Sequence, residues 1–304
     1  EDNFEPLSLT SIKVATGTYS PTSAPSDTIT DLRDFTFHMA DSSAVLIGGY
    51  NSSTGLKTTT QSVLQGVNNY HVFMTSDLPA GTEINNFMLT GGSGNKNSAL
   101  HLTYDGYSFS RESGGGIINA YSDIKYIDCI FTENEAPYGG AIYSSNSTDS
   151  FFNCTIRKNV APNWSLGSGS ASGAAGGCYF ISGSVYMKSC LIDSNSIYGY
   201  ANIPGPSGYT VSSTSGGGLI ISNGSLTAEN CVFDDNLSTT GVAVASLSSG
   251  NVFRNCVFIN NDADLYPFAL NKPQKGSGIW SRQSYNRVYG CSFIGNNSYE
   301  DAAI

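Results

Sequence analysis

The sequence predicts an all-β fold, a right-handed parallel β-helix of about eight to nine coils with three short strands per coil. A phrase of Cys, one residue, Phe or Ile, two residues and Asn begins at Cys129, Cys154, Cys190, Cys231, Cys256 and Cys291. Successive copies lie 25, 36, 41, 25 and 35 residues apart, a spacing typical of repeat architectures. Sustained helical spacing of apolar residues is absent, which also favours strands.

Each repeat contains three β-prone segments in a fixed order. The first follows a glycine pair, as in 115–118, 139–142, 176–179 and 217–220. The second is a short apolar segment, such as 124–126, 185–187 or 226–228, and the third is the Cys phrase itself. Gly, Ser, Asn and Asp separate the three segments, and these residues favour turns. Such units, repeated in series, predict coils that stack on one another.

The Cys phrase predicts three columns of stacked side chains. Cys and the residue two later point to the same side of a strand, because side chains alternate with a period of two. Stacking then places one Cys column and one Phe or Ile column inside the coil, with an amide ladder at the following turn. Asn suits this ladder better than Asp, because stacked carboxylates repel each other. The predicted ladder residues are Cys129, Cys154, Cys190, Cys231, Cys256, Cys291, Asn134, Asn159, Asn195, Asn236, Asn261 and Asn296.

The whole chain, residues 1–304, is expected to form one β-helix domain. Residues 1–92 are predicted to form irregular N-terminal coils, and residues 93–304 are predicted to form the regular coils. The N-terminal part contains short β-prone segments at 12–14, 35–37, 45–47 and 71–74. The segment 86–89 resembles the Cys phrase, with Phe87 in the position of the Cys.

Long insertions occur at one place in the repeat, between the Asn and the next glycine pair. Few residues separate the two after Asn134 and Asn236, but about 15 to 20 do so after Asn159, Asn195 and Asn261. The insertions should therefore leave the same corner of successive coils, and insertions on one face often mark the working face. They carry Trp164, Tyr198, Tyr200, Tyr209, Tyr266 and Phe268, which we expect to bind a glycan or protein ligand. Alternatively, these rings pin the long loops onto the coil.

Composition indicates an extracellular or cell-surface protein. Only 12% of the 304 residues are charged, against about 25% in ordinary soluble proteins. The net charge of −10 argues against nucleic acid as a partner, and no apolar run is long enough to insert in a membrane. The chain begins at Glu1, so we expect secretion followed by removal of a signal peptide.

The seven cysteines are expected to be buried thiols rather than disulfides or zinc ligands. No pair has CxxC spacing, and stacked Cys residues have parallel Cβ directions that disfavour a bridge. Cys178 lies in a different predicted strand, so its redox state stays open.

Four asparagines in Asn-x-Ser/Thr sequences are candidates for N-glycosylation: Asn51, Asn146, Asn163 and Asn223. Asn236 and Asn296 have the same sequence pattern but belong to the predicted inner ladder. We therefore expect those two to carry no glycan.

The segment 131–142, FTENEAPYGGAI, resembles the paired FxxN and GGA[ILV] repeats of the polymorphic outer membrane protein family. The same repeats occur in secreted right-handed β-helix proteins of bacteria. Segments 17–22, 35–37 and 47–50 look like the first coils of such surface proteins. The resemblance covers most of the chain and implies the β-helix fold and an extracellular, often adhesive, passenger domain.

Catalytic residues are not expected. The galacturonan hydrolases of this fold use Gly-His-Gly and Arg-Ile-Lys motifs, and both are missing here. Asp193, Asp234 and Asp235 fall at related positions of neighbouring coils, where weak calcium binding is conceivable, and no other cofactor is expected. A polysaccharide lyase or hydrolase stays an alternative.

The sequence therefore predicts a non-enzymatic extracellular protein that is adhesive or ligand-binding through the insertions on one side. A structural subunit of an extracellular filament or array is the alternative. The last Cys phrase ends eight residues before Ile304, and an uncapped coil would favour end-to-end self-association.

Overall fold

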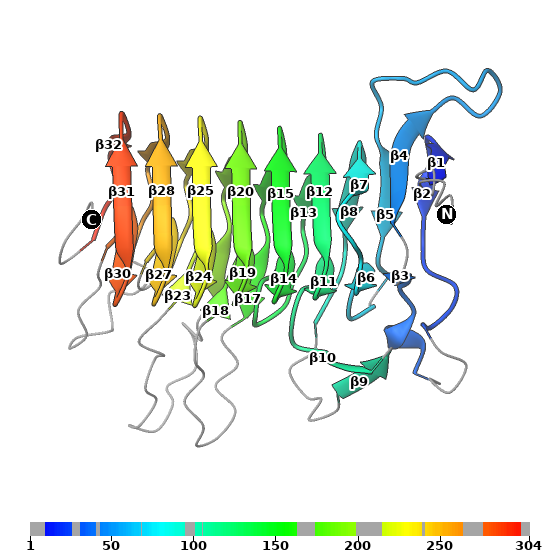
Figure 1. The fold of residues 1–304 in the computed structure, drawn as a ribbon, viewed down its shortest axis with the longest axis horizontal. Coiled ribbons are helices and arrows are strands. Elements are labelled where there is room, and N and C mark those ends of the chain that lie inside the picture. Colours follow the sequence, from blue (N-terminus) through cyan, green and yellow to red (C-terminus); the bar gives the residue numbers. More distant parts are fainter. Residues whose placement is uncertain are drawn as a thin grey trace, which may run out of the picture.

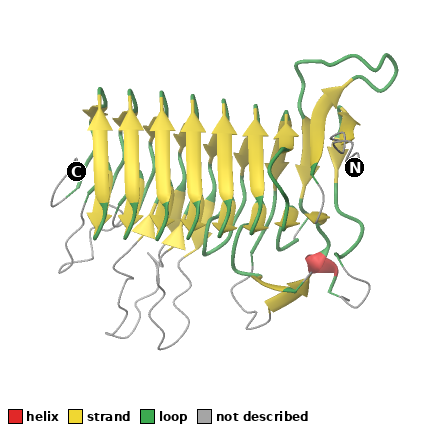
Figure 2. Cartoon of the chain, in the orientation of Figure 1, coloured by secondary structure: helices red, strands yellow, loops and turns green. Residues whose placement is uncertain are grey.

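The computed structural model describes residues 10–25, 31–40, 43–67, 69–94, 101–104, 106–162, 174–198, 215–238, 241–263 and 276–298. Within these ranges the chain winds through three parallel sheets, whose strands follow one another along the long axis (Figure 1). The helical content of the described part is the single 3-10 turn η1 (Leu32–Asp34), coloured red in Figure 2.

The three sheets are named here in the order in which a coil passes through them. Sheet I contains β3 (Phe37–Ala40), β6 (Phe73–Ser76), β11 (Ile117–Ala120), β14 (Ile142–Ser145), β19 (Cys178–Ile181), β24 (Leu219–Ser222), β27 (Val244–Leu247) and β30 (Ile279–Arg282). Sheet II contains β1 (Thr10–Ala15), β4 (Ala44–Tyr50), β7 (Thr82–Asn85), β12 (Asp123–Ile127), β15 (Thr148–Phe152), β20 (Ser184–Lys188), β25 (Ser225–Glu229), β28 (Gly250–Arg254) and β31 (Tyr285–Tyr289). Sheet III contains β2 (Thr18–Tyr19), β5 (Ser62–Gln65), β8 (Phe87–Thr90), β13 (Ile130–Thr132), β16 (Thr155–Arg157), β21 (Leu191–Asp193), β26 (Val232–Asp234), β29 (Val257–Ile259) and β32 (Ser292–Ile294).

The strand order confirms the predicted parallel β-helix. The 8-stranded sheet I defines eight full coils in the described part, preceded by an incomplete turn made by β1 and β2. The register shifts once inside sheet II, between Lys13 and Ala15 of β1. Two N-terminal strands begin later than predicted, at Phe37 and Phe73, and η1 with its C-cap residue Phe35 occupies the chain just before β3.

Most corners of the described coils are formed by one residue in the left-handed backbone region. All 18 described non-glycine residues with positive φ, between 47 and 62°, directly follow a strand of one of the three sheets. Short polar side chains tolerate this conformation better than most. This requirement explains why Asn, Asp, Ser and Gly separate the three segments of every repeat.

At most of these corners, the residue after the left-handed one turns inward, and its side chain donates a hydrogen bond to the carbonyl two residues earlier. In one coil, Ser147 Oγ donates to Ser145 O at 2.9 Å and Cys154 Sγ donates to Phe152 O at 3.4 Å. At the third corner, Asn159 Nδ2 donates to Arg157 O at 2.9 Å. We name these the serine corner (sheet I to II), the cysteine corner (II to III) and the asparagine corner (III to I). One device therefore builds all three corners with three different side chains.

The asparagine corner forms a continuous ladder through six coils. Asn159 Nδ2 donates to Asn195 Oδ1 at 2.9 Å, and the backbone N of Asn159 donates to the same oxygen at 3.1 Å. The same pair of bonds links each of the other neighbours in turn, in the order Asn134, Asn159, Asn195, Asn236, Asn261 and Asn296. This is the amide ladder that the Cys phrase predicts.

Buried thiols and aromatic rings fill the interior of the coil. All seven cysteines are free, and Cys291 in the last coil is the one that is not fully buried. The rings of Phe233 and Phe258 stack with centroids 4.8 Å apart, and Phe293 continues the stack at 4.7 Å from Phe258. Cys178 is buried in sheet I, outside the column at the cysteine corner.

The serine corner was not predicted. The residue seven positions before each Cys of the repeat occupies it: Ser122, Ser147, Gly183, Gly224, Ser249 and Ser284. Ser147 Oγ accepts a bond from Ser122 N at 3.1 Å, and Ser284 Oγ accepts one from Ser249 N at 3.1 Å. The two glycines interrupt this ladder in the middle of the solenoid. The constant spacing of seven residues was the signal that could have revealed it.

Candidate ligand surface on the insertion side

The three long insertions leave and re-enter the solenoid at the asparagine corner. The described flanks of the first are β17 (Val160–Pro162) and β18 (Ala174–Ala175), and those of the second are β22 (Ser196–Tyr198) and β23 (Ser215–Gly216). β17 pairs with β22 and β18 pairs with β23, both in parallel. The third insertion follows Asp262, which bridges to Leu237 of the preceding coil. The flanks therefore form a small extra layer beside sheet I.

The predicted binding residues lie in the insertions, almost entirely outside the described ranges. Tyr198 ends β22, but its side chain lies outside the described residues. The other five predicted aromatic residues also lie outside the described ranges: Trp164, Tyr200, Tyr209, Tyr266 and Phe268. Their role in binding stays a prediction.

A fourth excursion at this corner was missed by the sequence reasoning. After β8, the chain forms an antiparallel hairpin of β9 (His101–Tyr104) and β10 (Tyr107–Ser110) before it returns to sheet I (Figure 1). Phe109 of β10 packs against Met74 and Ile118 on the outer face of sheet I. The Cys-like phrase at 86–89 and the glycine pair at 115–116 bracket the hairpin, and the length of chain between them was the signal that could have revealed it.

An ion pair and a ring stack hold the hairpin against the N-terminal coils. Arg111, directly after β10, donates from Nε and Nη2 to the two carboxylate oxygens of the buried Asp34. The Tyr70 ring lies between Arg33 and Arg111, whose guanidinium carbons are 4.2 and 5.0 Å from its centroid. The neighbouring His71 is buried, which lowers its pKa to about 4. Because these groups contact one another, we assign them to holding the hairpin on the N-terminal coils rather than to a ligand-binding site.

The outer face of sheet I carries a second apolar layer with a gap in it. In the register of the sheet its outward row is His38, Met74, Ile118, Tyr143, Tyr179, Ile220, Ala245 and Trp280. Met74 and Ile118 are buried beneath the hairpin, and Ile220 and Ala245 are buried in a cluster with Ala175 of β18. Tyr143 and Tyr179, between the two clusters, stay partly exposed.

Tyr138 joins these two rings to form a compact surface, which we call the tyrosine surface (Tyr138, Tyr143 and Tyr179). The Tyr179 centroid lies 5.6 Å from that of Tyr143 and 6.2 Å from that of Tyr138. Tyr138 also bridges to Ala175, so the surface adjoins the flank of the first insertion. Burial raises the pKa of all three hydroxyls, that of Tyr179 to about 12. The three side chains therefore stay neutral and can pack or hydrogen-bond at physiological pH.

A buried carboxyl lies inside the serine corner. Asp149 accepts hydrogen bonds from Ser144 Oγ at 2.5 Å and from Asn119 Nδ2 at 3.0 Å. Burial raises the pKa of Asp149 to about 7, although these hydrogen bonds act in the opposite direction. The Tyr126 hydroxyl is also buried and has no hydrogen-bond partner among the described residues. Because Asp149 is enclosed in the core, we assign it to the interior of the coil and not to ligand binding.

The acidic residues considered for calcium lie at the outer edge of sheet III. Register pairs Asp193 with Asp234, and Asp234 accepts a hydrogen bond from Asn260 Nδ2 at 3.4 Å. Asp235 forms the left-handed corner after β26. Across the described ranges, no group of three or more His, Cys, Asp or Glu side chains is arranged to hold a metal ion. Calcium binding there stays a prediction.

Three of the four candidate glycosylation sites are described. Asn51, Asn146 and Asn223 are exposed, whereas Asn163 lies outside the described residues. Asn146 and Asn223 form left-handed corners with φ of 53°. Asn236 is fully buried in the ladder and unsuited to carry a glycan. Glycosylation of the exposed three stays a prediction.

Comparison with known proteins supports the fold and leaves the activity open. In the described ranges no helix is long and apolar enough to span a bilayer. The chain matches no curated protein and no solved structure in these comparisons. A family model described as right handed beta helix region matches residues 170–303. With the strand order above, this match identifies the fold as a right-handed parallel β-helix.

Proposed function

We propose that this protein is a non-enzymatic extracellular or cell-surface protein that binds a glycan on the insertion side of sheet I. The observation that carries the proposal is the tyrosine surface, held between two covered clusters beside the first insertion. Tyrosine rings pack against the C–H face of a sugar, and their hydroxyls offer hydrogen bonds. Because Tyr143 and Tyr179 are already half-buried, little side-chain freedom remains to be lost on binding.

The chemistry of the surface favours binding over catalysis. Proton transfer requires a group whose pKa lies near the working pH. Burial moves the pKa of Tyr138, Tyr143 and Tyr179 away from neutrality, so these hydroxyls keep their protons. Adhesion through neutral aromatic contacts needs no such group. The low charge content and the resemblance to bacterial surface repeats support the extracellular assignment.

A glycan array probed with purified protein tests the proposal. We expect specific binding by the natural protein and a loss of at least tenfold in the double variant Tyr143→Ala/Tyr179→Ala, because both stacking rings are removed. Tyr186→Ala is the matched control, since Tyr186 lies on the outer face of sheet II in the same coil as Tyr179. The Tyr186 variant should bind like the natural protein.

Three other outcomes overturn the proposal. Specific capture of a protein partner, with no glycan bound, would make the surface a protein interface. Cleavage of a bound glycan into shorter products would show a lyase or hydrolase. Equal loss of binding in the control variant would place the ligand elsewhere.

End-to-end assembly is the second proposal. In the described part of the chain, β30, β31 and β32 are the last strands of the three sheets. Val288, Cys291 and Phe293, which point inward, are only partly buried there. A second solenoid stacked on this coil would cover them. Negative-stain electron microscopy of natively purified protein should then show fibres or arrays, whereas isolated short rods would contradict assembly.

A further inference from the structure

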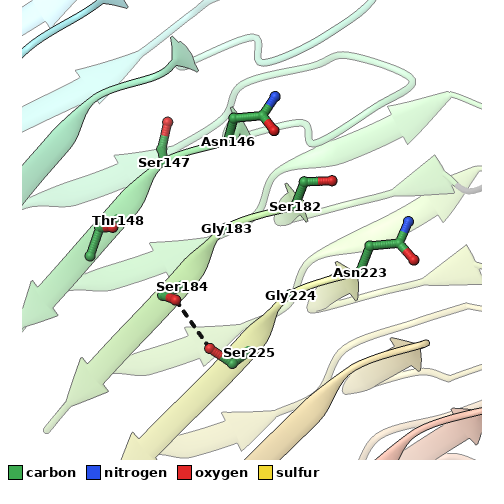
Figure 3. Close-up of a pocket in the computed structure, with 9 residues that line it drawn as sticks. All are labelled: Asn146, Ser147, Thr148, Ser182, Gly183, Ser184, Asn223, Gly224 and Ser225. Atoms are coloured by element: carbon green, nitrogen blue, oxygen red, sulfur yellow. Dashed lines mark hydrogen bonds between the residues drawn. The ribbon is translucent and has the colours of Figure 1, made fainter.

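An open groove runs along the serine corner, on a different edge of the coil from the tyrosine surface. It has a volume of about 500 Å³ and crosses three successive coils. Its lining is Asn146, Ser147, Thr148, Ser182, Gly183, Ser184, Asn223, Gly224 and Ser225. Figure 3 shows two parallel rows of side chains, with Asn146, Ser182 and Asn223 in one and Thr148, Ser184 and Ser225 in the other.

The two interruptions of the serine ladder lie on the floor of this groove. Gly183 and Gly224 replace the serines that occupy this corner in the neighbouring coils. A Cβ on Gly183 would lie 2.3 Å from Ser147 O, and one on Gly224 would lie 2.3 Å from Gly183 O. The backbones of these coils therefore approach each other too closely for a side chain. The floor stays bare while the two rows on either side project.

The walls of the groove offer neutral hydrogen-bonding groups in a regular array. Neighbouring coils are spaced about 4.8 Å apart, so amides and hydroxyls recur along both rows at that interval. All nine lining residues are Asn, Ser, Thr or Gly, in a protein of net charge −10. Asp123, next to Thr148 in the strand register, accepts a hydrogen bond from Thr148 N at 3.1 Å. The lining therefore suits an uncharged ligand rich in hydroxyl groups.

An exposed aromatic ring stands at one end of the same row. Tyr121 forms the left-handed corner one coil before Asn146, and its backbone N donates at 3.0 Å to the carbonyl oxygen of Ser145, the residue before Asn146. Its side chain is 50% exposed, and its ring lies 4.9 Å from that of Tyr107. An aromatic platform beside neutral amides and hydroxyls is the combination that holds a sugar ring by its face and its edge.

We propose that the serine-corner groove binds a neutral oligosaccharide, with one sugar ring against Tyr121 and the following ones between the two rows. This site is separate from the tyrosine surface and does not rest on the function proposed for it. The ligand's hydroxyl groups would exchange hydrogen bonds with Asn146, Asn223 and the Thr148–Ser184–Ser225 row. The existing bond from Ser225 Oγ to Ser184 Oγ, at 3.2 Å, shows that this row already bonds between coils.

Calorimetric titration of unglycosylated protein with cellohexaose, mannohexaose and hexagalacturonate tests this proposal. We expect a neutral hexasaccharide to bind and the charged one not to bind. The triple variant Thr148→Val/Ser184→Ala/Ser225→Ala should weaken binding about fivefold for each hydrogen bond it removes. Asn146→Asp should weaken it as well, because Asp tolerates the left-handed corner but has no amide donor.

Two controls separate this site from others. Thr227→Val, on the outer face of the same strand as Ser225, should leave binding unchanged. Tyr143→Ala should also leave it unchanged, so a failure here is distinct from a failure at the tyrosine surface. The proposal is overturned if neither neutral hexasaccharide binds, if hexagalacturonate binds equally well, or if the triple variant binds like the natural protein.

Discussion

The asparagine corner and the serine corner solve the same geometric problem and differ in continuity. Both follow a left-handed residue, and both place an inward side chain that bonds the carbonyl two residues earlier. The asparagine column is unbroken from Asn134 to Asn296, whereas the serine column is broken at Gly183 and Gly224. The groove at the serine corner crosses this column at Ser147, Gly183 and Gly224.

The difference shows how a repeat protein separates stability from recognition. A side chain that both donates and accepts hydrogen bonds between coils links each coil to the next. Every position along such a ladder therefore contributes to the stability of the solenoid. Where that link is left out, at Gly183 and Gly224, backbone hydrogen bonds between the coils still hold the sheets. We propose ligand surfaces at the interrupted column and at the corner that the insertions extend.

Removing one rung of the asparagine ladder should cause the largest loss. Asn195→Ala leaves the buried Asn159 N without its side-chain partner, and it removes the bonds that Asn195 makes with Asn159 Nδ2 and Ile156 O. At about 1 to 3 kcal/mol for the unsatisfied N–H and about 1 kcal/mol for each of the two lost bonds, we expect a loss of up to about 5 kcal/mol in the free energy of unfolding. Urea denaturation measures it. A loss below about 1 kcal/mol would mean that the ladder is not the stabilising element described here.

Removing the buried carboxyl should change the pH dependence of stability. The pKa of Asp149 is about 7 in the folded protein and about 3.9 in an unfolded chain. The folded state therefore binds the extra proton between about pH 4 and 7, so this group makes stability fall as pH rises through that window. Asp149→Asn should raise the free energy of unfolding by about 4 kcal/mol at pH 8 and change it little at pH 4.

In another coil, an asparagine already occupies the position equivalent to Asp149, which indicates that Asp149→Asn fits the structure. Asn251 Nδ2 donates to Ser246 Oγ at 2.6 Å, in the same arrangement as Asp149 and Ser144. Denaturation curves at several pH values, measured beside those of the natural protein, check the variant. An unchanged pH slope in Asp149→Asn would show that the carboxyl is ionised or solvated at neutral pH.

Truncating the serine ladder should have a smaller effect than truncating the asparagine ladder. Ser147→Ala removes one bond to Ser145 O and one from Ser122 N. We expect a loss of about 1 to 2 kcal/mol in the free energy of unfolding, because fewer groups are left unpaired. The comparison fails if this variant is as unstable as Asn195→Ala in the same denaturation series.

Removing the strain of one left-handed corner should produce the smallest change in the free energy of unfolding, and this change should be an increase. Lys158 is exposed, precedes Asn159 and has φ of 54°, a conformation that suits glycine better than lysine. Lys158→Gly should raise the free energy of unfolding by about 1 kcal/mol. Lys158→Ala, which keeps the Cβ, should bring no gain. Equal effects of the two substitutions would refute the assignment of strain to this corner.

The features that follow the strict Cys phrase were predicted from the sequence, whereas the interrupted serine corner and the hairpin were missed. The Cys phrase is a strict pattern, so the inner columns and the asparagine ladder followed from side-chain alternation alone. The serine corner was overlooked because Gly183 and Gly224 break its pattern, although its distance from each Cys is constant. The hairpin of β9 and β10 depends on Phe109 and Arg111 meeting residues far away in sequence, which no local pattern encodes.

The candidate surfaces were less predictable than the fold. Insertion lengths pointed to the correct corner, but the tyrosine surface is assembled from three segments whose register determines that Tyr143 and Tyr179 lie side by side. Tyr138 joins them through a left-handed Gly139, with φ of 74°. Such proximity is a property of stacked coils and becomes visible only when their register is known.

The most direct test of the proposed function is a crystal structure of the protein with a glycan selected on the array. The account predicts that a sugar ring lies against Tyr143 and Tyr179, beside the flank of the first insertion. A glycan bound only elsewhere on the solenoid, with these two rings bare, would contradict it.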